Sequence, residues 1–179
     1  MSTEGQGKGR RFVAWAAAAA GCFAALCIVA KVYGVHVNVS ASYPRGLWRV
    51  IERKPQKGDM VMFRAPMTNP VVRWGWDNSI VPPRIDGDPV LLKRIVGAPG
   101  DVVTLSDRVQ VNGIEIPNSP IFTHDGTGIE IPTVATSGPV PAGTWFLMSD
   151  YAPRSFDSRY FGPIAQSAVL GVAVPLLTW

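Results

Sequence analysis

One long apolar segment lies near the start of the chain, and short apolar segments separated by turn residues follow it. Residues 1–11 are polar and basic, and Phe12 to Ala30 form nineteen consecutive residues without a charged or polar side chain. As a helix this run spans about 28 Å, close to the ~30 Å thickness of the bilayer hydrocarbon. We therefore predict a cytoplasmic tail at 1–11 and a transmembrane anchor at 12–33, with Arg10 and Arg11 on the cytoplasmic side.

Three other signals fit the same segment less well. A cleaved signal peptide has a shorter apolar run of about 7–15 residues, and the candidate cleavage site Val39-Ser40-Ala41 lies well past the run. Residues 19–22, Ala-Ala-Gly-Cys, resemble a lipoprotein cleavage box without its leucine. Arg10-Arg11 resembles a twin-arginine signal.

The segment 34–179 has the pattern of a mainly β domain. Its short apolar runs alternate with Gly- and Pro-containing turns, and Asn112-Gly113 is typical of a type I′ hairpin. No long helix is predicted there, and residues 66–89 and 117–143 are predicted to be irregular. We expect antiparallel sheets behind a single N-terminal transmembrane helix, with strands at Leu47–Ile51, Asp59–Arg64, residues 91–98, Val102–Ile116, Thr144–Met148 and Ala168–Leu177, the last one closing the sheet.

Composition narrows the possible functions. The chain has 18 glycines and 16 prolines, which favours turns and short strands over a helical bundle. Its net charge of +4 is concentrated before residue 34, so a basic groove for nucleic acid is not supported. Both cysteines, Cys22 and Cys27, lie in the apolar segment, which leaves the remainder without a disulfide, a reactive thiolate or a zinc cluster. No cofactor or metal is predicted.

One lysine stands inside an apolar strand. Lys93 follows Leu91-Leu92 and precedes Ile95-Val96, and burial there would favour the neutral amine, a usable general base near neutral pH. On the strand alone, a lysine that simply faces solvent is the commoner case. Ser42, in a Ser-rich turn with Pro44 and Gly46, is a candidate nucleophile, although such turns are also common as plain loops.

Taken together, these segments resemble the type I signal peptidase family, membrane-bound serine proteases with a Ser–Lys dyad. The resemblance rests on Ser42, on Gly58–Phe63, on the run Lys-Arg-Ile-Val-Gly-Ala-Pro-Gly-Asp at Lys93–Asp101, and on Asp157-Ser158-Arg159. Within the family, Ser-Tyr-Pro-Arg-Gly-Leu-Trp at 42–48 is most similar to the TraF-type conjugal-transfer peptidases. The family box Gly-Asp-Asn-Arg-Asp-Asn-Ser appears here as Ser-Asp-Tyr-Ala-Pro-Arg-Ser at 149–155, so the family arginine falls on Ala152 and its role is vacant or moves to Arg154.

The resemblance implies a role for each matching residue. Ser42 would be the nucleophile and Lys93 the general base. The backbone N–H of Ser42 and the hydroxyl of Ser40 would stabilise the oxyanion, and Ser155 would bind the lysine amine. Asp157 and Arg159 would form the ion pair that supports this loop. His124 and Asp125 are expected to be solvated loop residues.

The resemblance also implies the cellular setting. The substrate would be a conjugative pilin precursor, bound as an extended strand and cleaved after a small-x-small sequence by a periplasmic catalytic domain at the inner membrane. In some members the pilin's own amino terminus resolves the acyl-enzyme, and the sequence leaves open whether the product here is cyclic. Two alternatives remain: a general leader peptidase for secreted preproteins, and a non-enzymatic membrane-tethered assembly factor of a transfer channel.

Overall fold

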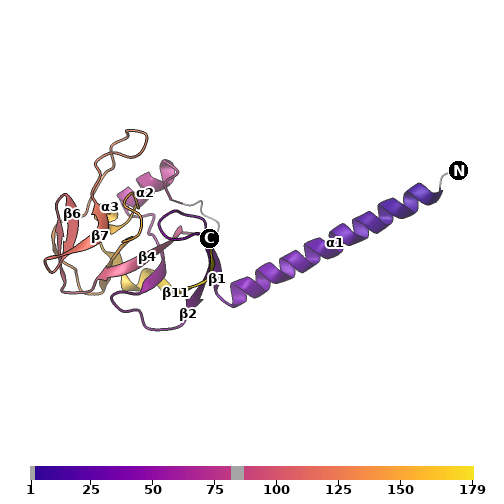
Figure 1. Ribbon diagram of the computed structural model, residues 1–179, viewed down its shortest axis with the longest axis horizontal. Coiled ribbons are helices and arrows are strands. Elements are labelled where there is room, and N and C mark those ends of the chain that lie inside the picture. Colours follow the sequence, from indigo (N-terminus) through magenta and orange to yellow (C-terminus); the bar gives the residue numbers. More distant parts are fainter. Residues whose placement is uncertain (1–2, 82–86) are drawn as a thin grey trace. The chain divides into compact units, whose positions relative to one another are not determined.

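The first part of the chain is one long helix. The computed structural model describes residues 3–81 and 87–179, and it divides the chain into two units, Met1–His36 and Val37–Trp179. Helix α1 (Thr3–Val32) contains the segment Val13–Ala30, which is long and apolar enough to cross a membrane (Figure 1). Its length and composition fit an anchor and an N-terminal signal sequence alike.

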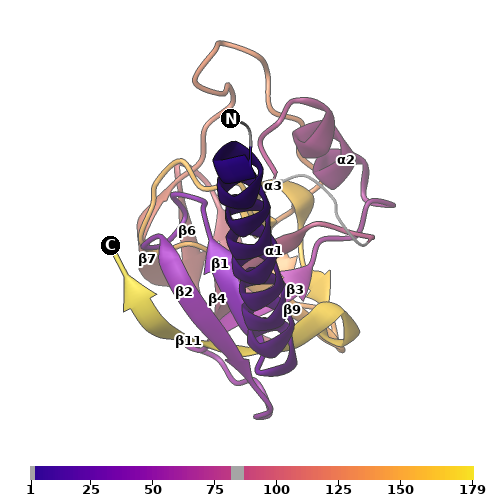
Figure 2. The same cartoon turned by 90° about the vertical axis from the view of Figure 1, so that its right-hand side faces the viewer.

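A seven-stranded sheet forms the centre of the second unit (Figures 1 and 2). The strand pairs whose register is known are all antiparallel, as the sequence predicted. In spatial order the strands are β1 (Val35–Asn38), β2 (Gly46–Ile51), β11 (Val169–Thr178), β3 (Met60–Arg64), β4 (Val90–Gly97), β9 (Thr144–Met148) and β10 (Ile164–Ala165). The predicted fold class, mainly β with antiparallel sheets, is confirmed.

A smaller sheet carries the predicted hairpin. Its strands lie in the order β7 (Ile114–Pro120), β6 (Arg108–Val111), β5 (Val102–Leu105) and β8 (Gly138–Pro139). Asn112 and Gly113 have φ angles of 52° and 78°, and positive φ at both central positions is what a type I′ turn requires. Asparagine and glycine tolerate that backbone better than other residues, so the two residues fix the register of β6 against β7.

The apolar side chains pack into three clusters. The largest joins the central sheet to two short helices, α2 (Pro70–Asp77) and α3 (Ser158–Phe161), and includes Phe63, Ile95 and Phe161. A second cluster lies between the two sheets, and a third contains Tyr43 and Trp48 beside the start of β2. Strand β4 contributes to all three clusters, which explains why its sequence is almost continuously apolar.

One local prediction was wrong. Residues 66–89 were predicted to be irregular, yet they contain α2; residues 82–86 lie outside the described part of the chain. The side chain of Asn69 accepts hydrogen bonds from the N–H groups of Val71 and Val72, and Pro70 occupies the first turn, where its missing N–H costs nothing. The second unit is therefore not purely β.

The last strand joins the two parts of the central sheet. The sequence predicted that Ala168–Leu177 is an apolar strand that closes the sheet. Strand β11 lies between β2 and β3 (Figure 2). Its residue Val172 is opposite both Ile51 and Val61. A 3-10 turn, η1 (Gln166–Ala168), leads into it.

Candidate active site

Strand β4 places the amine of Lys93 in the interior. Side chains two residues apart lie on the same face of a strand, so Lys93 shares its face with Leu91 and Ile95, both members of the largest core cluster. Only 2% of Lys93 is exposed. Burial lowers the pKa of Lys93 from 10.5 to about 8, the nearby carboxylate of Asp157 acts in the opposite direction, and Arg159 lowers the pKa further.

The segment between β1 and β2 carries Ser42, and one buried asparagine holds this segment in place. The amide nitrogen of Asn38 donates to the carbonyl oxygens of Tyr43 and Pro44, each at 3.1 Å. Its amide oxygen accepts from the backbone N–H of Ser40 at 3.2 Å. Asn38 thus satisfies backbone groups that a tight turn would otherwise leave unpaired. Sequence analysis missed this residue, although an asparagine just before a Ser-rich turn is a known turn signal.

Three predicted residues meet at the amine. Lys93 Nζ lies 2.6 Å from Ser42 Oγ and 2.8 Å from Ser155 Oγ. The two hydroxyl oxygens are 3.2 Å apart, with Ser155 donating to Ser42. The amine and the two hydroxyls therefore form a closed triangle of hydrogen-bonding groups, contributed by segments 51 and 62 residues from Lys93.

Asp157 and Arg159 form a fully buried ion pair next to this triangle. The guanidinium reaches both carboxylate oxygens of Asp157 at 2.8 Å. It also donates to the carbonyl oxygens of Pro120, Pro153 and Ser155 at 2.8–2.9 Å. Every contact is charge-assisted, so the pair holds the backbone that carries Ser155. Arg159 also ties that loop to β7, which ends at Pro120.

Two residues with proposed roles are occupied elsewhere. The hydroxyl of Ser40 donates to the amide oxygen of Asn38 at 2.8 Å, and a hydroxyl has only one proton to donate. The guanidinium of Arg154 lies 4.5 Å from the centre of the Phe122 ring, a cation–π contact. Among the described residues Arg154 forms no hydrogen bond with Ser42, Lys93 or Ser155, so it does not take a place in the triangle. His124 was expected to be a solvated loop residue; it is exposed and forms an isolated β-bridge with Glu130.

A second group of contacts surrounds Tyr43, which follows Ser42. The Tyr43 hydroxyl donates to Asp150 Oδ1 at 2.6 Å, and the other oxygen of Asp150 pairs with Arg94 Nε at 2.8 Å. Burial, and then this hydrogen bond to Asp150, raise the pKa of Tyr43. Asp150 thus links the residue after Ser42 to the residue after Lys93. Sequence analysis did not single out Tyr43, Asp150 or Arg94.

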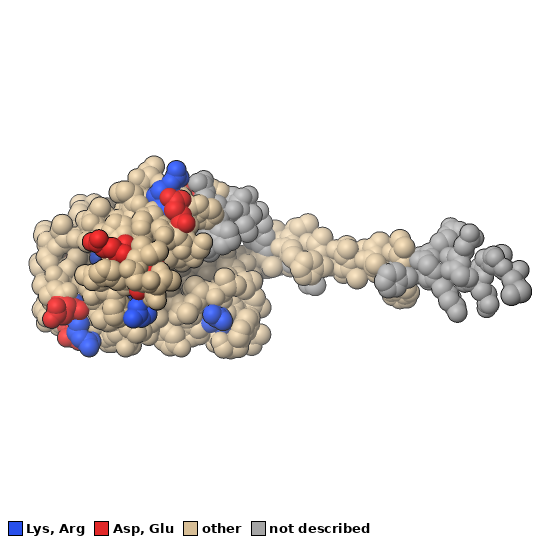
Figure 3. Space-filling view, turned by 90° about the horizontal axis from the view of Figure 1, so that it is seen from above, with Lys and Arg blue, Asp and Glu red and all other residues tan. Residues whose placement is uncertain are grey.

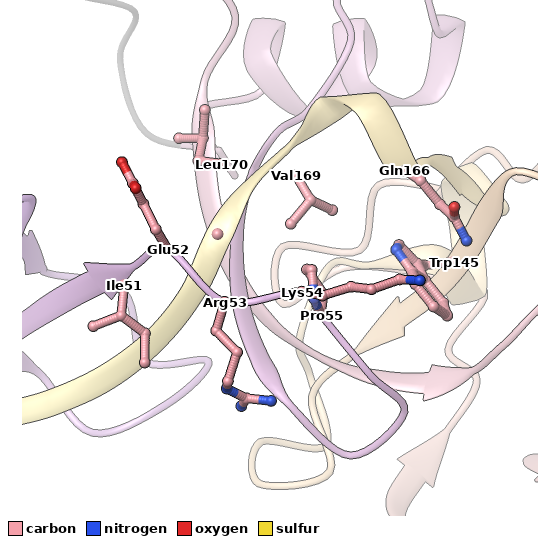
Figure 4. Close-up of a pocket in the computed structure, with 10 residues that line it drawn as sticks. Ile51, Glu52, Arg53, Lys54, Pro55, Trp145, Gln166, Val169 and Leu170 are labelled. Atoms are coloured by element: carbon pink, nitrogen blue, oxygen red, sulfur yellow. The ribbon is translucent and has the colours of Figure 1, made fainter.

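Other surface features lie outside the triangle. A pocket of about 220 Å³ is lined mainly by residues 51–55, at and after the end of β2, and by residues near the start of β11 (Figure 4). None of the predicted site residues lines it.

On the face seen in Figure 3, acidic and basic side chains are interspersed over the domain. Within the described ranges 3–81 and 87–179, no group of three His, Cys, Asp or Glu side chains could hold a metal ion.

A buried amine of lowered pKa against a serine hydroxyl is an arrangement that can make a serine nucleophilic for acyl transfer. The fold and this contact together describe a mainly β protein in which a buried lysine lies against a serine hydroxyl. The chain belongs to the signal peptidase family, peptidase S26, whose sequence pattern matches residues 9–179. Members of this family are serine peptidases. The resemblance predicted from the sequence is confirmed.

Curated relatives place the chain more narrowly. It is 36% identical over 156 residues to the conjugal transfer protein TraF of Agrobacterium fabrum, a match that covers 85% of this chain and 87% of that protein. It is 34% identical over 161 residues to a plasmid transfer protein TraF of Escherichia coli, covering 87% and 91%. A crystal structure of signal peptidase I from Enterococcus faecalis V583 is 27% identical with a TM-score of 0.38, covering 67% of this chain and 97% of that one.

Proposed function

We propose that this protein is a membrane-anchored serine endopeptidase in which Ser42 is the nucleophile and Lys93 the general base. The observation that carries the proposal is the 2.6 Å separation of Lys93 Nζ from Ser42 Oγ. Burial supports it, because a pKa of about 8 leaves a useful fraction of the amine neutral at physiological pH. With the pKa at 10.5, the neutral fraction at pH 7 would be smaller by about 300-fold.

The triangle gives each proton a destination. When Lys93 is neutral, its lone pair accepts the proton of Ser42, while its own N–H groups can donate to Ser155 Oγ. Ser42 Oγ forms a bond to the carbonyl carbon of the substrate, and the tetrahedral intermediate then breaks its C–N bond. The departing amine takes the proton from Lys93. In the second half, water or an amine attacks the acyl-enzyme while Lys93 accepts its proton. The ester bond to Ser42 Oγ then breaks, and Lys93 returns the proton to that oxygen.

The oxyanion needs hydrogen-bond donors fixed in advance. The backbone N–H of Ser42 donates to no other group among the described residues, which leaves it available for this role. The hydroxyl of Ser40 is a second candidate, but it first has to release the amide oxygen of Asn38. Ser155 would stabilise the alkoxide of Ser42, since its hydroxyl already donates to that oxygen. In this proposal, Asp157 and Arg159 hold Ser155 in place.

The substrate is inferred from the relatives. The TraF proteins of Agrobacterium fabrum and Escherichia coli are named for conjugal and plasmid transfer. We infer that this chain processes a conjugative pilin precursor, bound as an extended strand, for plasmid transfer. The apolar segment of α1 would anchor it in the inner membrane, with residues 1–11 cytoplasmic and the peptidase domain, residues 34–179, in the periplasm.

Two substitutions test the chemistry. Ser42→Ala and Lys93→Ala should each lower precursor cleavage by about a thousand-fold or more while the protein stays folded and membrane-bound. Ser167→Ala and Lys54→Ala are the controls, because both residues are exposed and lie outside the triangle. Cleavage that survives Lys93→Ala would remove the dyad from the proposal.

Mass spectrometry of the precursor decides the substrate class and the second half-reaction. Wild-type enzyme should yield one cut after a small-x-small sequence, and Ser42→Ala should yield none. A product lighter than the linear peptide by one water shows resolution by an amine. Efficient cleavage of many unrelated preproteins would indicate a general leader peptidase instead. Transfer that persists with both Ser42→Ala and Lys93→Ala would indicate a non-enzymatic assembly factor.

A further inference from the structure

Ser149, the residue directly after β9, is buried and takes part in four hydrogen bonds. Its hydroxyl donates to the carbonyl oxygen of Ser42 at 2.6 Å and accepts from the N–H groups of Tyr151 at 3.1 Å and Ala152 at 2.9 Å. Its backbone N–H donates to Asp157 Oδ2 at 3.1 Å. None of its surface is exposed. One side chain thus connects the nucleophile segment to the loop that carries Ser155.

The direction of these hydrogen bonds is fixed. A hydroxyl has one proton and two lone pairs, and both backbone N–H partners can only donate. The proton of Ser149 must therefore go to the carbonyl oxygen of Ser42. Because the peptide bond is planar, holding this oxygen fixes the peptide between Ser42 and Tyr43, and with it the ψ angle of Ser42.

A second contact holds the other side of the same peptide. The hydroxyl of Tyr43 donates to Asp150 at 2.6 Å. Ser149 thus holds Ser42, and the next residue, Asp150, holds Tyr43. The family box has a glycine where this chain has Ser149, and glycine has no hydroxyl to offer. A glycine at this position could not make the contact with the Ser42 carbonyl.

We propose that Ser149 and Asp150 form a clamp on the Ser42–Tyr43 peptide, and that Ser149 is a positioning residue for the nucleophile. The inference rests on the proposed function. Ser149 does not touch the hydroxyl of Ser42. It acts through the carbonyl, by limiting rotation of the backbone that carries the hydroxyl toward Lys93. Positioning of this kind raises the rate of the chemical step more than it raises substrate affinity.

The test uses the full chain in detergent and an internally quenched peptide with small residues one and three positions before the scissile bond. In both Ser149→Ala and Ser149→Gly, kcat per folded molecule should fall about ten-fold with KM changed less than two-fold. The pH midpoint of kcat/KM should stay at the wild-type value, because Lys93 keeps its surroundings. Equal losses in the two variants identify the hydroxyl, not Cβ, as the group responsible.

Ser119→Ala is the matched control. Ser119 is as buried as Ser149, and its hydroxyl bonds to the backbone of Val109 in the smaller sheet. That variant should lose stability and keep its kcat. The clamp is refuted if folded Ser149→Ala has the wild-type kcat, if only KM changes, or if the pH midpoint moves.

A second variant covers the case in which neither Ser149 variant folds. Tyr43→Phe removes the hydrogen bond to Asp150 and keeps the ring, and it should also lower kcat with little change in KM. An unchanged kcat there overturns the clamp. The proposed function is tested separately: if Ser42→Ala and Lys93→Ala cleave the peptide like wild type, the peptidase proposal itself has failed. If they do not cleave and the Ser149 variants are normal, only the clamp has failed.

Discussion

Lys93→Met should make the protein more stable, by an amount that depends on pH. Methionine has nearly the length of lysine and no charge, so it fits an interior surrounded by Leu91 and Ile95. The hydroxyls of Ser42 and Ser155 lose the amine but keep each other at 3.2 Å. The substitution mainly removes an amine whose charged form is costly to bury.

The magnitude follows from the pKa of the amine. Lys93 has a pKa of about 8 in the folded protein and 10.5 as its ordinary value, so the unfolded chain holds the proton more tightly. Below pH 8 this difference costs the wild type ~3 kcal/mol of stability. The wild type regains stability as the pH rises from about 8 through 10.5, because the unfolded chain then also loses its proton. The advantage of Lys93→Met should therefore shrink by ~3 kcal/mol across this range.

Urea unfolding of the two full chains in detergent, followed by tryptophan fluorescence between pH 7 and pH 10, measures this difference. Other groups titrate in the same range, but they are shared by both proteins and cancel in the comparison. An advantage that stays constant from pH 7 to pH 10 would refute the reasoning. Such a result would mean that the amine keeps its ordinary pKa in the folded protein and is not desolvated.

Two further outcomes follow from the same site. Because only the neutral amine can act as a base, kcat/KM should rise with pH to a midpoint near 8 and fall about ten-fold per pH unit below it; a midpoint near 10.5 would contradict a role for buried Lys93. Asp157→Asn leaves Arg159 charged and fully buried without its partner, so the free energy of unfolding should fall by about 3–5 kcal/mol in urea titrations. A loss below about 1 kcal/mol would show that the ion pair does not hold the loop.

The strands were predictable where burial and turn chemistry agree. Thr144–Met148 is a strand with the predicted bounds, and Asn112-Gly113 forms the predicted turn. Helix α2 was missed because it is only eight residues long and its buried positions, Val71, Val72 and Gly75, are too few to give a clear period. Its Asn-Pro start was the available signal. The central place of β11 could not be read from an apolar run, because edge and central strands can have similar sequences.

The site was predictable as a set of residues and less so as a geometry. Lys93, Ser42 and Ser155 meet, and Asp157 pairs with Arg159. The acceptor of a serine hydroxyl depends on which polar groups the fold brings close to it, and the residue type alone does not predict that. Ser40 therefore bonds to Asn38, a residue that the sequence did not single out. Ser149 was visible only as a departure from the family box, with nothing in the sequence to say which carbonyl it would reach.

The position of β11 has a consequence for the synthesis of the protein. This strand follows every other strand in the sequence, and it lies between β2 and β3 at the centre of the sheet. Until residues 169–178 have left the ribosome, β2 and β3 have no common neighbour, so the central sheet is incomplete. A nascent chain thus contains Ser42 and Lys93 before the sheet that carries β2 and β4 is complete. In the proposed peptidase, we therefore expect full activity only after β11 has been inserted between β2 and β3.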